Sequence, residues 1–224
     1  VWPSVRPQAP VPVGILSYYQ GGKINVVEFA DFECPFCRAL HPQLKKLVKE
    51  REGQVNFVRL NMPLPRHESA LGAAKAAVCA DAQGKGDEMA DQLFEVEDLS
   101  ATSLRRIAVK IRLDPRAFDS CFMAPSTLER IQREGKILRD AGFQGLPTTY
   151  VGARQIVGAQ SEEVFREAFD QASRGDSGNG VPGGVFAALI AAAVGAVAFL
   201  GRRDEDAEGD DGGAGRGGGD DDDD

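Results

Sequence analysis

The distribution of apolar and polar residues predicts a mixed α/β domain. Short apolar runs rich in β-branched residues are typical of strands, and they occur at 24–30, 55–60, 148–151 and 154–157. Between the second and third runs, apolar residues recur at helical spacing from about 68 to 138. Helical patterns also follow the first run and cover 161–172. The predicted order is therefore strand, helix, strand, a helical block, two strands and a last helix.

The composition changes at both ends of this predicted domain, which we place at residues 14–174. Residues 1–13 are rich in proline and indicate an extended lead-in, whereas 175–180 are glycine-rich and indicate a flexible linker. Residues 202–224 hold eleven acids against three arginines, which accounts for the whole net charge of -8. We expect this tail to be disordered. Because the rest of the chain is neutral, we expect no nucleic-acid partner.

Residues 181–201 form an apolar run without a charge, followed at once by Arg202 and Arg203. A helix of that length covers roughly 30 Å, enough to cross a bilayer. An alanine-rich buried helix is the alternative. We favour a transmembrane helix, with the tail in the cytoplasm and the domain outside it. The chain does not begin with methionine, so the lack of a visible signal peptide carries little weight.

Candidate chemistry centres on Cys34-Pro35-Phe36-Cys37, between the first predicted strand and a predicted helix. Pro35 suits the first helical position, which places Cys34 at a helix N-terminus. Free amide groups and the helix dipole favour an anion there, and the thiolate is the reactive form of cysteine. The alternatives are two buried thiols or half of a metal site. A four-cysteine zinc site prefers two close pairs and only one is present, so we expect no metal.

Glu28 lies in the middle of the first apolar run, where an acid needs an explanation. It is either an exposed edge residue or a buried carboxylate. In the second case it would exchange protons with Cys37 through water.

Residues 28–37 resemble the active-site segment of thioredoxin-fold disulfide oxidoreductases, most closely the DsbA-like group. Residues 145–151 match a second signature of that family, a cis proline that faces the active-site cysteines, here at Pro147. The resemblance covers roughly residues 14–173. It implies a thioredoxin fold with a helical insertion at about 66–142, and substrate contacts by Leu146, Pro147 and Phe36.

The resemblance implies a thiol–disulfide oxidoreductase without a cofactor. Cys34 would attack, Cys37 would resolve, and Glu28 would carry protons. The partners would be substrate proteins with thiols or disulfides and a recycling partner in the membrane. With Pro-Phe in place of Pro-His between the cysteines, and with Glu33 beside them, we expect a mild oxidant or a reductant.

Three alternatives to this extracytoplasmic oxidoreductase stay open. The same site could serve a reductase or isomerase. The domain could be a redox-inert binding module, or a cytosolic reductant anchored by its tail.

Cys79 and Cys121 lie in separate predicted helices of the insertion. They are either two small buried apolar residues or a structural disulfide, which some members of the family carry. We favour the disulfide, because no other role is evident for the pair.

Overall fold

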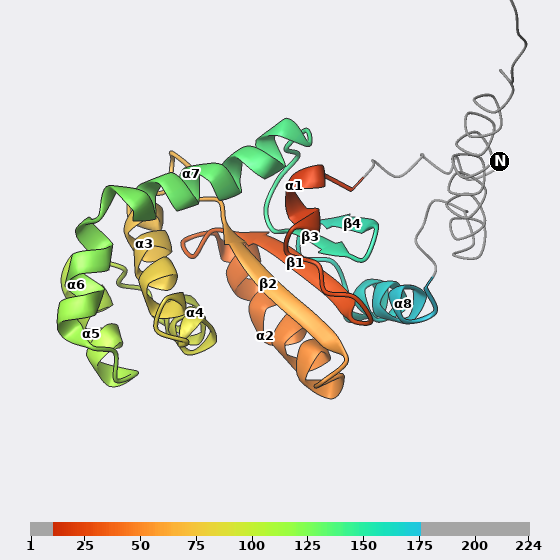
Figure 1. The fold of residues 1–224 in the computed structure, drawn as a ribbon, viewed down its shortest axis with the longest axis horizontal. Coiled ribbons are helices and arrows are strands. Elements are labelled where there is room, and N and C mark those ends of the chain that lie inside the picture. The colour runs from red at the N-terminus through yellow and green to blue at the C-terminus, as the bar shows by residue number, and fades with distance from the viewer. Residues whose placement is uncertain (1–10, 176–224) are drawn as a thin grey trace, which may run out of the picture. The chain divides into compact units, whose positions relative to one another are not determined.

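The computed structural model describes residues 11–175, which form a four-stranded sheet with helices on both faces (Figure 1). The strands lie in the order β2-β1-β3-β4. The inner strand β1 pairs in parallel with β2 and antiparallel with β3, and β3 pairs antiparallel with β4. Their bounds are Ile24–Ala30 for β1, Val55–Asn61 for β2, Thr148–Val151 for β3 and Arg154–Val157 for β4.

One face of the sheet is covered by α2 (Pro35–Glu50) and α8 (Glu162–Ser173). Their apolar side chains form one buried cluster with residues of that face, including Val26, Leu44 and Phe165. The opposite face packs against α1 (Val13–Leu16) and α7 (Pro125–Asp140), in a second cluster that contains Phe29 and Tyr150. Residues that alternate along β1 therefore belong to two different cores, as a sheet buried on both faces requires.

Five helices lie between β2 and β3 in the chain, and four of them pack together beside the β2 edge of the sheet (Figure 1). The four are α3 (Ala70–Asp81), α4 (Gly86–Glu95), α5 (Ala101–Lys110) and α6 (Pro115–Met123). The fifth, α7, leads back from them to the sheet. This arrangement places the helical block next to β2, so side chains of the block can contact polar side chains of that strand.

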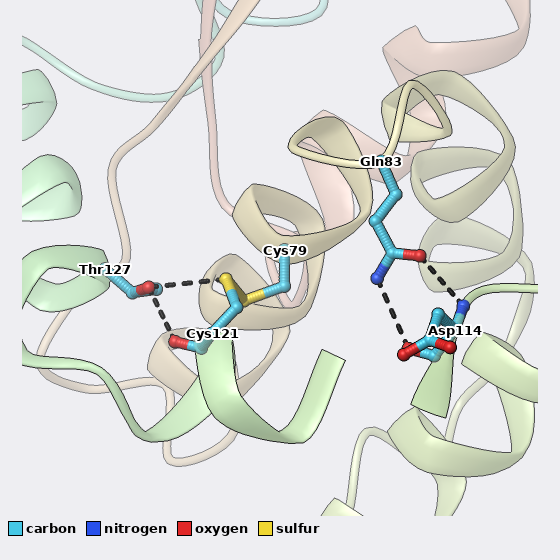
Figure 2. Close-up of a disulfide and its surroundings, with 5 residues drawn as sticks. All are labelled: Cys79, Gln83, Asp114, Cys121 and Thr127. Atoms are coloured by element: carbon cyan, nitrogen blue, oxygen red, sulfur yellow. Dashed lines mark hydrogen bonds between the residues drawn. A yellow bond between two sulfur atoms is a disulfide. The ribbon is translucent and has the colours of Figure 1, made fainter. Parts of the chain in front are cut away.

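A disulfide between Cys79 of α3 and Cys121 of α6 joins two of these helices (Figure 2). The Thr127 hydroxyl donates to the carbonyl of Cys121 at 2.7 Å. The Asp114 amide donates to the side chain of Gln83 at 2.8 Å, which adds a second link between the same two segments. The helical block is therefore held by a covalent bond as well as by its apolar core.

The mixed α/β fold expected from the sequence is confirmed, and every predicted helix and strand within residues 11–175 is present. Ser161 immediately precedes α8, but its side chain does not cap the helix. The predicted transmembrane helix at 181–201 and the predicted tail lie outside the described residues. Among the helices of residues 11–175, none is long and apolar enough to cross a bilayer.

Candidate active site

Cys34 lies at the start of α2, where the chain leaves the sheet. It is the N-cap residue, with extended backbone angles, and Pro35 begins the helix. Cys37 lies in the first turn. Both cysteines are reduced and buried, whereas the Phe36 side chain between them is 62% exposed. The motif therefore combines an exposed aromatic side chain with two buried cysteines.

The two thiols differ strongly in acidity. The pKa of Cys34 falls from 9.0 to about 6, chiefly because it accepts a hydrogen bond from the Cys37 thiol. Contacts with the backbone of Cys37 and Phe36 lower it further, as expected at a helix N-terminus. Donating that hydrogen bond and burial both raise the pKa of Cys37. At neutral pH the pair therefore consists of a thiolate at Cys34 and a thiol at Cys37.

A polar cluster supports the loop that carries the motif. Asp31 is buried, and its carboxylate accepts hydrogen bonds from the amides of Glu33 and Leu64, both at 2.8 Å. The ring of His67 lies 2.8 Å from the same carboxylate. Glu33, which we expected to act on Cys34, instead accepts a hydrogen bond from the amide of Ser69 at 2.7 Å. Among the causes that act on the pKa of Cys34 is the charge of Asp31, which raises it.

Glu28 is fully buried in the inner strand, so the exposed-edge alternative is wrong. Its Oε2 accepts a hydrogen bond from Nε of Arg59 at 2.8 Å. The two residues are direct partners in the parallel register of β1 and β2. The hydrogen bond donated to Cys34 and burial are the main causes that raise the pKa of Cys37, and the charge of Glu28 adds to them. The site therefore contains a buried carboxylate paired with an arginine, on the strand that leads to the cysteine motif.

Two buried side-chain oxygens, Oε1 of Glu28 and Oγ1 of Thr149, have no hydrogen-bond partner among residues 11–175. Glu28 and Thr149 are direct partners in the antiparallel register of β1 and β3. Buried polar atoms in such a position are commonly satisfied by an internal water.

Pro147 immediately precedes β3, and the peptide bond between Leu146 and Pro147 is cis. Leu146 is buried in the same apolar cluster as Cys34 and Cys37. Pairing between β3 and β1 ends at Thr148, the first residue of β3. The backbone of Leu146 therefore lies beyond the paired part of the two strands. That position is suited to pairing with an extended peptide.

The sequence analysis singled out the two cysteines, Glu28 and Pro147 as candidates, but it named none of the partners of the carboxylate. Arg59 and Thr149 reach Glu28 only through strand register, which a single sequence does not reveal. An arginine within an apolar strand was the signal available for Arg59. The sequence analysis also gave His67 no chemistry, and the structure pairs it with Asp31. In the part of the chain that the structure describes, no three His, Cys, Asp or Glu side chains cluster as metal ligands would.

Comparison with known proteins agrees with this geometry. A protein family described as Thioredoxin matches residues 21–171 of the chain. A curated relative, the Na(+)/H(+) antiporter NhaA 3 of Salinispora tropica, is 32% identical over 147 residues. That match covers 65% of this chain but only 22% of the antiporter, so the chain spans about a fifth of that relative's length.

Solved structures resemble the fold closely. The thiol-disulfide exchange protein alpha-DsbA2 from Wolbachia pipientis matches with a TM-score of 0.64 and 21% identity, over 72% of this chain and 95% of that one. A thioredoxin-like oxidoreductase from Silicibacter pomeroyi matches with a TM-score of 0.62 and 28% identity, over 68% of this chain and 88% of that one. The family match covers more than half of the chain and the structural matches agree with it. The chain therefore belongs to the thioredoxin family and shares the fold of DsbA-like proteins.

Proposed function

We propose that this chain is a thiol–disulfide oxidoreductase that forms or exchanges disulfide bonds in substrate proteins through Cys34 and Cys37. The observation that carries the proposal is the difference in pKa between the two cysteines, which gives a thiolate at Cys34 beside a thiol at Cys37. A low-pKa thiolate attacks disulfides readily and is also a good leaving group. The activity of the two solved relatives described above supports the same chemistry.

The exchange passes through a mixed disulfide. When the enzyme oxidises a substrate, the substrate thiolate attacks Cys34, the Cys34–Cys37 bond breaks, and Cys37 leaves and takes a proton. A second substrate thiolate then attacks the mixed disulfide, which forms the substrate disulfide and releases the Cys34 thiolate. When the enzyme reduces a substrate, the same bonds form and break in the reverse order. No metal or organic cofactor takes part.

The neighbouring residues have separate roles in this mechanism. Glu28 would exchange the proton of Cys37, through a water held by its free oxygen and the hydroxyl of Thr149. Leu146 and Pro147 would align the substrate backbone beyond the end of β3. The exposed ring of Phe36 would contact the substrate side chains next to the reacting sulfur.

We further propose that the domain is tethered to a membrane by residues 181–201 and works outside the cytoplasm. The charge-free run and the following arginine pair support this placement. The disulfide between Cys79 and Cys121 is also typical of proteins in oxidising compartments. A recycling partner in the same membrane would then restore the redox state of the site.

The reduction potential of the Cys34–Cys37 pair, measured in glutathione buffers, tests the proposal. A value of about −120 to −180 mV would support an oxidant or isomerase, and a value near about −270 mV would support a reductase with the same site. If the pair does not exchange with glutathione at all, the enzymatic proposal fails. A redox-inert binding module would keep its cellular role in the variant Cys34→Ser, whereas the oxidoreductase would lose it.

A further inference from the structure

A chain of polar contacts leads from the buried carboxylate of Glu28 to the helical block. Arg59 donates a hydrogen bond from Nε to Glu28, and its Nη2 lies 3.3 Å from Nδ1 of His41. His41 is on α2, one turn after Cys37, and only 9% of it is exposed. The histidine therefore contacts a second nitrogen of the guanidinium that is paired with the carboxylate.

His41 is itself held by α4. Its Nε2 lies 2.9 Å from Oδ1 of Asp91, and the second oxygen of Asp91 is paired with Lys45 of α2. The imidazole ring also packs against the ring of Phe94, with 4.7 Å between centroids. A cavity of about 320 Å³ borders His41, Arg59 and Asp91, so water has access to the outer end of the chain of contacts.

The chemistry of these groups determines the tautomer of His41. A guanidinium only donates hydrogen bonds, so Nδ1 must accept the one from Arg59. The ring proton therefore lies on Nε2, where it is donated to Asp91. Burial and the charge of Arg59 lower the pKa of His41, whereas Asp91 and Glu28 act in the opposite direction. The ring is consequently neutral at neutral pH and keeps its acceptor toward Arg59.

We propose that His41 is a positioning residue for disulfide exchange: fixed by Asp91, it holds the Arg59 guanidinium against Glu28, so that the carboxylate stays paired and oriented to accept the Cys37 proton. The inference rests on the proposed function, because it acts through the proton transfer assigned to Glu28. It adds a role for the helical block, since Asp91 belongs to α4. The block would then support the chemistry as well as the shape of the domain.

Two variants separate the two contacts of His41. His41→Asn places an amide oxygen near the position of Nδ1 and can still accept from Arg59. His41→Gln places an amide nitrogen near the position of Nε2 and can donate to Asp91, but it leaves Arg59 unheld. His41→Phe removes both contacts and keeps a ring against Phe94. Glu28→Gln serves as the reference for the proposed proton transfer.

The assay is a single-turnover oxidation of the reduced full-length chain by excess glutathione disulfide, from pH 5 to 9. Acid quenching and mass analysis separate the attack by Cys34 from the resolution by Cys37. The attack step uses the same thiolate in every variant, so it is the internal control. Thermal unfolding of each variant shows whether it is folded.

We expect His41→Gln and His41→Phe to move the acidic limb of the pH profile of the resolution rate toward higher pH by about one unit. Loss of one charge-assisted contact has an effect of that order of magnitude. Resolution on that limb would slow about tenfold. His41→Asn should stay within about twofold of the wild type, and the attack step should be unchanged in all three. A purely structural role for His41 would lower stability in all three variants without moving the profile.

The outcomes distinguish the inference from the proposed function. If Glu28→Gln slows resolution but His41→Gln and His41→Phe follow the wild-type profile, the inference is wrong and the role of Glu28 stands. If His41→Asn shifts the profile as much as His41→Gln, the contact with Arg59 is not the cause and the inference again fails. If Glu28→Gln itself resolves normally, the proton transfer assigned to Glu28 fails, and the role of His41 fails with it. Should His41→Phe not fold, the Asn and Gln pair still decides.

Discussion

Replacing Cys37 tests the origin of the acidity of Cys34. In Cys37→Ala the thiol that donates to Cys34 is gone, and this hydrogen bond is the largest of the causes that lower the pKa of Cys34. We therefore expect the pKa of Cys34 to rise in this variant. The backbone contacts at the start of α2 remain, so the pKa should not return to its ordinary value.

The expected size follows from the structure. The fall in the pKa of Cys34 from 9.0 to about 6 corresponds to about 4 kcal/mol in favour of the thiolate. A hydrogen bond to a charged group contributes about 1.5–3 kcal/mol, and a thiol is a weak donor, so the lower end applies. Its loss should raise the pKa of Cys34 by about 1. The remainder belongs to the backbone amides of the first turn.

The pKa is read from the ultraviolet absorbance of the thiolate during a pH titration. A single alkylation rate would not suffice, because a thiolate becomes more nucleophilic as its pKa rises. Cys37→Ser is the matched control, since its hydroxyl can replace the thiol as donor and the variant equally lacks the active-site disulfide. We expect the pKa of Cys34 in Cys37→Ser to stay close to that of the wild type.

Two results would refute this reasoning. If Cys37→Ala keeps the wild-type pKa at Cys34, the helix N-terminus alone accounts for the acidity. If Cys37→Ser raises it as much as Cys37→Ala, the hydrogen bond is not the cause, and the packing of the second sulfur is.

Three further predictions concern pH, proton transfer and stability. Because the pKa of Cys34 is lowered, the stability that its thiolate adds to the reduced form is absent below about pH 6 and grows as pH rises toward 9.0. The reduction potential, measured against glutathione, should fall by about 59 mV per pH unit below about pH 6 and by about 30 mV per pH unit above it. A single slope over the whole pH range would contradict this prediction. Thr149→Val removes the hydroxyl that would hold the relay water beside Glu28, so resolution should slow about tenfold; quenched-exchange measurements check this, and an unchanged rate would contradict it. Replacing Cys79 and Cys121 by alanine opens a loop with a sequence separation of 42 residues and should cost about 4 kcal/mol in denaturant unfolding, with exchange at Cys34 retained; a loss below about 1 kcal/mol would show that packing alone holds the helical block.

The parts of this protein that were predictable from its sequence are those with local signals. The strand at 24–30 and the start of α2 at Pro35 follow from apolar runs and from the restraints that proline imposes. Glu28 could be singled out because an acid within an apolar run is unusual. Its neighbours could not, because the register of three strands places Arg59 and Thr149 beside it.

The contact between His41 and Asp91 was even less predictable. The two residues are 50 positions apart, and they meet only because α4 packs against α2 at the edge of the sheet. On the sequence alone, His41 is an ordinary member of a helix. Interactions that depend on how distant helices pack have no signature in local spacing, and this site depends on several of them.

The two cysteine pairs lie in one molecule in opposite redox states, with Cys34 and Cys37 reduced while Cys79 and Cys121 are joined. Each of these four residues is synthesised as a thiol, so the bond between α3 and α6 has to be made before the helical block reaches its final stability. The protein therefore needs, for its own folding, the kind of disulfide formation that we propose it catalyses. Its maturation depends on an oxidant that is already present, or on an earlier copy of itself.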